Sequence, residues 1–368
     1  MDTFSGKVGL VQRVLPVYRA PFFNALGKAC LGGLSVFTGL PRPAEMIKTT
    51  PTLLDAALVE GKNHHFFHGS RYLCWQSGLR GWLANWDPDI LIVEANPRYL
   101  STPGAIRWMK TRHRPVIGWG LGAPSLTGPL AGLRRNRRLA LLSELDIMIT
   151  YSQNGAAEYT NLGFPPDRIF IAANAVTPPP AHPLPVRSNL KTGQKARILF
   201  VGRLQARKNI ANLLQACADR PEDQQPELVI VGDGPDRARL EALAAEIYPA
   251  AVFTGALYGD ALETQFRAAD LFVLPGTGGL AIQQAMSFGL PVIAAEADGT
   301  QADLVRPANG WQVPPNDTAA LSQALEEALS NTVHLRQMGA ESYRIVAEEI
   351  NLDRMVSVFI DALNRSLA

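Results

Sequence analysis

Two cations follow an apolar run in the stretch VGRLQARKN, residues 201–209, where Arg203 and Lys208 stand five positions apart. A guanidinium binds a phosphate group through two parallel hydrogen bonds, and an ammonium adds a compact point charge. The pair therefore suits the binding of a diphosphate. Taken alone, the stretch is equally typical of a basic loop in solvent.

The stretch PGTGGLAIQQAMSFG, residues 275–289, places glycines at positions 276, 278 and 279 just before a helix that is expected to begin at Leu280. The free amide groups and the macrodipole of a helix N-terminus attract an anion, and glycines let a phosphate approach the backbone. We expect Gly278, Gly279 and Leu280 to contact the same diphosphate.

Weaker signals stand at three other places where strands are expected to end. Gly202 precedes the first cation, Gly234 lies in VGDGPDRARL, and the backbone groups of Ala256 and Leu257 in FTGALYGD could read the edge of a nucleobase. Each of these features also fits a simple connecting loop. Ligands collect at the carboxyl ends of parallel strands, so several such signals in chain order favour one nucleotide site.

The first half of the chain has fewer candidates. Tyr18 and Arg19 follow the first apolar run, and Glu94 and Arg98 follow the run ILIVEA, residues 90–95. These side chains are candidates for contact with an acceptor molecule. A polar helix cap explains Tyr18 and Arg19 equally well, and a role without acceptor contact is favoured for Glu94 and Arg98. His64, His65 and His68 have no carboxylate close by in the sequence, and we interpret them as surface or packing residues and not as metal ligands.

A basic segment, LRRNRRLALLSEL, precedes and enters an apolar helix at residues 133–145. Basic residues beside an apolar face are typical of a helix that docks on an anionic membrane surface. The membrane-docking candidates are Arg134, Arg135, Arg137 and Arg138. The alternative is a solvated helix start whose leucines pack internally.

Short apolar runs alternate with helical patterns along the whole chain, which predicts an α/β fold with two Rossmann-like parallel-sheet domains. We expect an N-terminal domain over residues 1–175, a Pro-rich linker over 176–195, a C-terminal domain over 196–345, and a closing helix over 346–368 that packs back on the N-terminal domain.

The composition indicates a globular protein, with 47% hydrophobic and 18% charged residues among 368. The net charge of +2 hides an asymmetry, because residues 1–175 hold 19 Lys+Arg against 11 Asp+Glu. A basic first half favours an anionic partner, such as a phosphate-bearing acceptor or a membrane surface. Three separated cysteines, no signal-peptide pattern and no apolar run of spanning length lead us to expect a cytoplasmic protein, for which the inner face of the membrane is an open location.

Residues 196–345 resemble the retaining family 4 glycosyltransferases of the GT-B fold. The resemblance lies in ARILFVGRLQARKNIANLLQA, LVIVGDGPDRARLEALA, VFTGAL and AADLFVLPGTGGLAIQQAMSFGLPVIA. It implies two domains that face each other across a cleft, and it assigns Arg203 and Lys208 to the donor diphosphate. It also assigns Gly279 and Leu280 to the backbone that caps this group.

Three positions depart from the family pattern. Gln284 stands where the second Glu of the Glu-x7-Glu motif bonds the ribose, and its amide can also bond two hydroxyl groups. Gly276 stands at the first Glu, near the donor sugar. Trp119, an acceptor-side candidate, stands where the family often has a His.

The resemblance implies transfer of a sugar from a nucleotide-diphosphate sugar to a glycan or lipid-linked acceptor, with retention of configuration and in bacterial-type glycan, glycolipid or polysaccharide synthesis. No cofactor, metal or nucleic-acid partner is expected. Two alternatives stay open at this point: a non-catalytic nucleotide-sugar-binding protein or partner subunit, and a sugar-nucleotide epimerase of the same fold.

Overall fold

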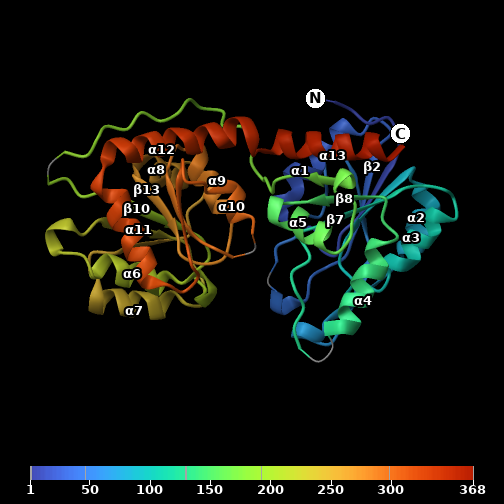
Figure 1. Cartoon of the computed structure of the whole chain (residues 1–368), viewed down its shortest axis with the longest axis horizontal. Helices are drawn as coiled ribbons and strands as arrows, with labels where there is room; N and C mark the ends of the chain where they lie inside the picture. The colour runs from blue at the N-terminus through green and yellow to red at the C-terminus, as the bar shows by residue number, and fades with distance from the viewer. Residues whose placement is uncertain (1, 46, 129–130, 192, 298, 368) are drawn as a thin grey trace. The chain divides into compact units, whose positions relative to one another are not determined.

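The computed structural model describes residues 2–45, 47–128, 131–191, 193–297 and 299–367. By its internal contacts the chain forms two compact units. Unit 1 comprises residues 1–176 and 352–368, and unit 2 comprises residues 177–351. Figure 1 shows that each unit has a central sheet with helices packed on it.

Within the described residues, unit 1 contains a sheet of seven strands in the order β3-β2-β1-β6-β7-β8-β9, and all neighbouring strands pair in parallel. The strands are β1 (Val8–Val11), β2 (Leu34–Thr38), β3 (Ala57–Glu60), β6 (Ile90–Glu94), β7 (Val116–Gly120), β8 (Ile147–Thr150) and β9 (Ile169–Ile171). The central strands β1, β6, β7 and β8 are almost entirely buried, as expected for a parallel sheet covered on both faces.

Two apolar clusters cover the faces of this sheet. One joins it to α1 (Ala20–Ala29) and to α13 (Leu352–Leu367), where Phe359 packs edge-on against Phe22 at 4.9 Å between ring centroids. The other joins it to α2 (Leu79–Trp86), α3 (Thr102–Lys110), the end of α4 (Ala131–Leu142) and α5 (Gln153–Asn161). The chain's last helix is thus part of the core of unit 1 (Figure 1).

A short antiparallel hairpin of β4 (Lys62–Phe66) and β5 (Leu73–Ser77) lies outside the main sheet. It carries two of the three clustered histidines. His64 Nε2 is 3.1 Å from Ser77 Oγ, and His65 Nδ1 is 2.8 Å from the Tyr72 hydroxyl. These hydrogen bonds give both rings a packing role within the hairpin.

Unit 2 contains a parallel sheet in the order β12-β11-β10-β13-β14-β15. Its strands are β10 (Arg197–Val201), β11 (Glu227–Val231), β12 (Val252–Gly255), β13 (Leu271–Leu274), β14 (Val292–Ala295) and β15 (Gly310–Val313). Its helices are α6 (Ile210–Ala218), α7 (Arg237–Ile247), α8 (Gly259–Ala268), α9 (Leu280–Ser287), α10 (Gln301–Leu304), α11 (Thr318–Ser330) and α12 (Thr332–Arg344).

The Pro-rich segment expected as a linker packs on unit 2 instead of forming a free tether. The Arg187 guanidinium donates to the backbone oxygens of Phe266, Phe288 and Ala269 at 2.7 to 2.9 Å. The Tyr343 hydroxyl donates to the His182 carbonyl oxygen at 2.5 Å. Residues 346–351 also group with unit 2, so the division near the C-terminus falls at Leu352 and not at residue 346.

Candidate functional site

The signals of the second half meet at one edge of the unit 2 sheet. Strands β10, β11, β12 and β13 are neighbours and parallel, so the loops after Val201, Val231, Gly255 and Leu274 all leave the same edge. Gly202 lies in the first of these loops, Gly234 in the second, and Ala256 and Leu257 in the third. We call the residues 202–209, 232–236, 256–258 and 275–279 the unit 2 loop site.

Lys208 ties two of these loops together. It ends the 3₁₀ turn η5 (Ala206–Lys208), and its Nζ donates to the backbone oxygen of Thr277. Burial lowers the pKa of the Lys208 ammonium to about 8, and the neighbouring Arg207 charge acts in the same direction. The charged form of Lys208 is therefore destabilised by burial, and an anion that binds beside it offsets this penalty.

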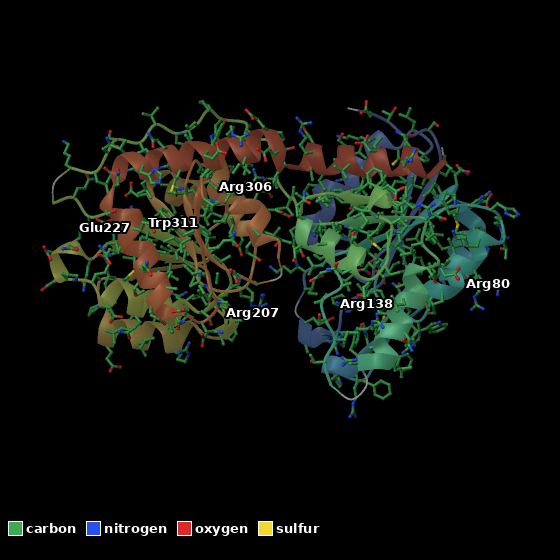
Figure 2. The ribbon with its side chains drawn as sticks, in the orientation of Figure 1. Arg80, Arg138, Arg207, Glu227, Arg306 and Trp311 are labelled. Carbon is green, nitrogen blue, oxygen red and sulfur yellow. The ribbon has the colours of Figure 1, made fainter. Side chains whose placement is uncertain are left out.

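Arg207 was not singled out in the sequence, although it adjoins Lys208. Its Nη1 donates to Thr277 Oγ1 at 2.8 Å, so it reaches the same loop as Lys208. Figure 2 labels Arg207 on unit 2. Arg203 lies in an exposed position of the loop that follows β10. The loop site therefore brings Arg203, Arg207 and Lys208 together on one segment, of which two members contact the glycine-rich loop.

The glycines of the loop after β13 are required by this contact. A Cβ atom at Gly276 would lie 2.4 Å from the Arg207 backbone oxygen and 2.5 Å from the Lys208 carbonyl carbon. A Cβ at Gly278 would lie 2.6 Å from Lys208 Nζ, and its φ of +141° also favours glycine. Gly276 is thus a point where two backbones touch, and it leaves no room for the Glu side chain of the family motif.

The two glutamines of α9 have different environments. Gln283 is fully buried, and its Nε2 donates to the Ile350 carbonyl oxygen at 2.8 Å. Gln284 is only partly buried, one residue further along the helix. Gly279 is the N-cap of α9 and Leu280 is its first residue, so the helix begins where the sequence predicted. Gln283 is therefore structural, and Gln284 is the candidate for contact with a ligand.

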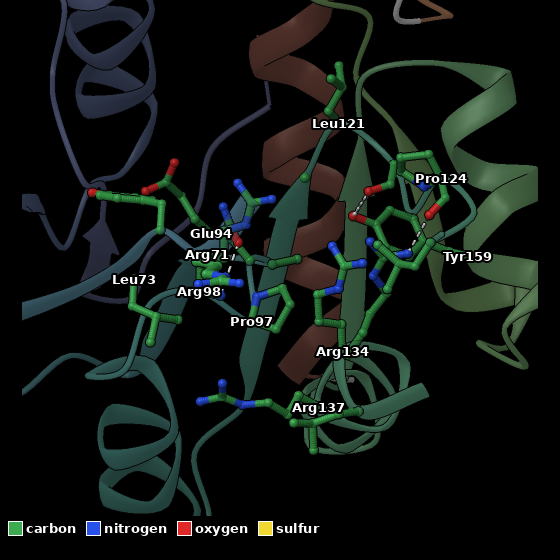
Figure 3. Close-up of a pocket in the computed structure, with 18 of the residues that line it drawn as sticks. Arg71, Leu73, Glu94, Pro97, Arg98, Leu121, Pro124, Arg134, Arg137 and Tyr159 are labelled. Carbon is green, nitrogen blue, oxygen red and sulfur yellow. Dashed lines mark hydrogen bonds between the residues drawn. The ribbon is translucent and has the colours of Figure 1, made fainter. Parts of the chain in front are cut away.

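Unit 1 contains a cavity of about 1060 Å³ at the carboxyl ends of its own strands. Its lining includes three of the five acceptor-side candidates, Glu94, Arg98 and Trp119. It also includes Arg134, Arg137 and Arg138 of α4, which the sequence had suggested for membrane docking. Figure 3 shows Arg134 and Arg137 projecting from α4 toward the strand that carries Glu94, with Arg71 and Arg98 beside it. We call this space the unit 1 cavity.

Two of the α4 arginines also hold the loop that follows β7. Arg138 Nη1 donates to the Pro124 carbonyl oxygen at 2.8 Å, and Arg134 Nη2 donates to the Thr127 carbonyl oxygen. Burial lowers the pKa of the Arg138 guanidinium, and the charges of Arg98 and Arg134 act in the same direction. The arginines of this cavity thus repel one another through space.

Glu94 is the single carboxylate that lines the cavity among the described residues. Its Oε2 accepts a hydrogen bond from the Arg13 backbone N–H at 2.6 Å. Burial raises the pKa of the Glu94 carboxyl to about 7, although the Arg13 N–H and charge oppose this shift. The indole of Trp119 is 3% exposed, and its Nε1 has no hydrogen-bond partner in the part of the chain that the structure describes.

Three of the sequence candidates do not line this cavity. Tyr18 is half exposed on the turn before α1. Arg19 contacts two residues of the lining: its Nη2 donates to the Tyr151 hydroxyl at 3.3 Å, and its guanidinium lies 5.9 Å from the Trp119 ring centroid. Arg135 is exposed on α4 and is absent from the lining.

Two further features concern only the part of the chain that the structure describes. No group of three or more His, Cys, Asp or Glu side chains is placed there to hold a metal ion. None of the helices in the same residues combines the length and the apolar character that crossing a bilayer requires. Membrane docking through α4 stays a prediction.

Comparison with known proteins finds a family that unit 2 is similar to. Residues 186–345 match the family described as "Glycosyl transferases group 1". A GDP-mannose-dependent alpha-mannosyltransferase of Mycobacterium tuberculosis is 38% identical over 168 residues, which are 45% of this chain and 40% of that protein. The chain thus covers about two fifths of the length of this relative.

Two comparisons extend over almost the whole chain. A D-inositol 3-phosphate glycosyltransferase of Gordonia bronchialis is 25% identical over 356 residues, which are 90% of this chain and 73% of that protein. The solved structure of Alr3699/HepE from Anabaena in complex with UDP has a TM-score of 0.72 and 14% identity, and it covers 99% of this chain and 100% of that one. The likeness to the Anabaena protein establishes the two-domain fold.

Proposed function

We propose that the chain is a glycosyltransferase that transfers a sugar from a nucleotide-diphosphate sugar to an acceptor hydroxyl group, in line with the match of residues 186–345 to the glycosyl transferases group 1. The observation that carries the proposal is the loop site of unit 2, where a cationic segment is bonded to the glycine-rich loop that opens α9. The donor diphosphate binds there, and the unit 1 cavity binds the acceptor.

The chemistry follows from the charges. As the glycosidic bond to the donor breaks, negative charge develops on the departing diphosphate, and Arg203, Lys208 and the amide groups at the start of α9 stabilise it. The diphosphate takes the proton of the acceptor hydroxyl, and the sugar keeps its anomeric configuration. With this set of cations, the protein needs no divalent metal to neutralise the leaving group.

The relatives suggest classes of donor and acceptor. One is described as using GDP-mannose and another as acting on D-inositol 3-phosphate. For this chain we propose a role in the synthesis of a bacterial-type glycan, glycolipid or polysaccharide. If the acceptor is lipid-linked, the basic first half of the chain supports a peripheral contact with the cytoplasmic face of a membrane.

The test is a donor screen. GDP, UDP and ADP sugars are added to the full chain, and the melting temperature is measured, since a ligand that binds the native state raises it. The donor that stabilises the protein is then tested for turnover with and without EDTA, and the anomeric configuration of the product is read by NMR. A donor that binds without release of nucleotide diphosphate under any acceptor would contradict the proposal.

Gly276 supports a second candidate, a nucleotide-sugar-binding subunit without activity. No side chain fits at Gly276, so the carboxylate that the family places near the donor sugar cannot stand there. Donor binding at normal affinity with no turnover favours this candidate. Interconversion of the donor sugar without any acceptor would instead favour an epimerase.

A further inference from the structure

We propose that the unit 1 cavity is a binding site for an amphiphilic anion, a phosphate ester with an apolar body, and that this is the class of acceptor on which the enzyme acts. The identification as an acceptor rests on the proposed glycosyltransferase function. The identification as an anion site rests on the cavity alone.

Charge is the first argument. Five arginines line the cavity, Arg71, Arg98, Arg134, Arg137 and Arg138, against the single carboxylate of Glu94. Arginines from three separate segments of the chain converge there, so the excess does not follow from one basic run. Arg134 and Arg138 are partly buried, whereas Arg71, Arg98 and Arg137 are exposed at the cavity surface. Like charges that are brought together are stabilised by an anion that binds between them, and guanidinium groups match the geometry of phosphate oxygens.

The orientation of α4 is the second argument. Arg134, Arg137 and Arg138 line the cavity, whereas Arg135 of the same helix does not. The helix therefore directs one basic face into a concave space. A helix that used these four arginines to dock on a flat membrane surface would present them outward.

The apolar lining is the third argument. Leu73, Leu121, Leu126 and Leu133 share the cavity with the arginines, together with the rings of Trp119 and Tyr159. Leu121 and Leu133 are 44% and 59% exposed, so this lining offers apolar surface whose burial by a ligand would be favourable. A wholly polar anion, such as a free sugar phosphate, would leave this surface uncovered.

A second cavity indicates where the apolar body extends. It has a volume of about 490 Å³ and shares Asn96, Pro97 and Arg137 with the first. Leu100, Ile106 and Leu141 line it between α3 and α4. The first cavity already equals the upper end of the usual range for ligand pockets, about 300–1,000 Å³, so the two together accommodate a ligand longer than one sugar.

The experiment measures binding to the full chain by isothermal titration calorimetry. The probes are octyl phosphate, glycerol 3-phosphate and octyl glucoside, all below their micelle concentrations. We expect octyl phosphate to bind at least about tenfold more tightly than either of the others. Equal affinity for glycerol 3-phosphate would overturn the apolar part of the proposal, and equal affinity for octyl glucoside, or no binding of octyl phosphate, would overturn the anionic part.

Two charge reversals on one helix locate the site. Arg137→Glu should weaken the binding of octyl phosphate by about tenfold or more, the order expected for the loss of one charge-assisted hydrogen bond. Arg135→Glu changes the net charge equally but lies outside the cavity, so its effect should stay below about twofold. Similar losses in both variants would show that only long-range attraction is at work, and would overturn the site. Unchanged melting temperatures verify the fold of both.

GDP and UDP binding is measured with the same variants. If octyl phosphate binds as expected but neither nucleotide binds, the proposed glycosyltransferase function fails while the anion site stands. If a nucleotide binds and octyl phosphate does not, the anion site fails while the proposed glycosyltransferase function stands. A lipid source and a soluble source of the phosphate ester are distinguished by vesicles of phosphatidylcholine with and without a phosphate-terminated lipid, which bind the protein in the first case only.

Discussion

Both units place cations at the carboxyl edge of a parallel sheet. In unit 2 a close contact between two backbone segments positions these cations, whereas in unit 1 they line a cavity. In unit 2 the cations are bonded to a neighbouring loop: Lys208 and Arg207 contact Thr277, and Gly276 allows the two backbones to touch. In unit 1 the arginines line an open volume, and although Arg134 and Arg138 also bond to the loop after β7, no close backbone contact among the described residues fixes their positions as Gly276 does in unit 2. A backbone-built site suits a ligand group that never varies, such as a diphosphate, whereas a cavity lined by side chains can change with its ligand.

The largest expected effects on turnover test the unit 2 loop site. Arg203→Ala and Lys208→Ala should each reduce turnover by at least about a hundredfold, as the loss of one donor that stabilises developing charge commonly does. The control is Lys195→Ala, which removes an exposed charge before β10. Normal turnover and normal melting in either variant would show that unit 2 does not hold the leaving group in this way.

The close contact at Gly276 gives the next prediction. Gly276→Ala should lower the free energy of unfolding by about 1–3 kcal/mol, because the added methyl group forces two backbones apart. Gly279→Ala is the matched control, since a Cβ there would meet no heavy atom closer than Thr300 Oγ1 at 3.5 Å. It should cost less than about 1 kcal/mol. Urea denaturation of the two variants measures the difference.

The close contact at Gly276 also determines what we expect when the first Glu of the Glu-x7-Glu motif is restored. Gly276→Glu should be destabilised at least as much as Gly276→Ala, and it should not gain turnover, because a carboxylate cannot enter without displacing Arg207 and Lys208. A stable and more active Gly276→Glu protein would show that the loop opens easily, and the backbone-built description of unit 2 would then be wrong.

The arrangement of the unit 2 loop site was largely predictable because its parts are local, and its role as a donor site stays a prediction. Arg203, Lys208 and the glycines before α9 stand in short continuous stretches, and the strand order then brings those stretches to one edge. Two features escaped prediction for physical reasons. The bonds from Arg207 and Lys208 to Thr277 join residues about seventy positions apart, and the Gln283 bond to Ile350 depends on how α9 packs.

The unit 1 cavity was predictable only in part. Glu94 and Arg98 were candidates from their place after a strand, but no pattern in the sequence shows that α4 turns its arginines toward them. Along the chain, a helix, a strand, a loop and the first part of α4 lie between Arg98 and Arg137. A basic helix start therefore suggested a membrane surface, and only the tertiary structure directs three of its four arginines into a cavity.

A smaller effect tests Gln284, the glutamine of α9 that we propose contacts the donor. Gln284→Ala should weaken donor binding by about 1–3 kcal/mol, the cost of leaving hydroxyl groups unmatched, while Gln284→Glu should be tolerated because a carboxylate also accepts from two hydroxyls. Calorimetry with the donor found in the screen measures both. Unaltered binding by Gln284→Ala would place the ribose elsewhere in unit 2.

The smallest effect should come from protonation of Glu94, and it distinguishes the two sites because it belongs to the cavity alone. The pKa of this carboxyl is raised to about 7, so the group is neutral below pH 7 and negative above it. Arg13, Cys74, Tyr99 and Tyr151 interact electrostatically with Glu94, and the pKa of each lies above the range from pH 6 to 8. Octyl sulfate is the suitable probe, since its own charge is constant over this range.

The affinity of the cavity for octyl sulfate should rise by about threefold as the pH falls from 8 to 6. Protonation of Glu94 removes the one negative charge that opposes the arginines, and solvent screening keeps the effect of this charge small. The Glu94→Gln variant is neutral at every pH, so it should bind at the wild-type pH 6 affinity throughout and lose the dependence. Nucleotide binding should keep its wild-type pH profile in this variant. A pH dependence of octyl sulfate binding that persists in Glu94→Gln would mean that another group titrates in the cavity.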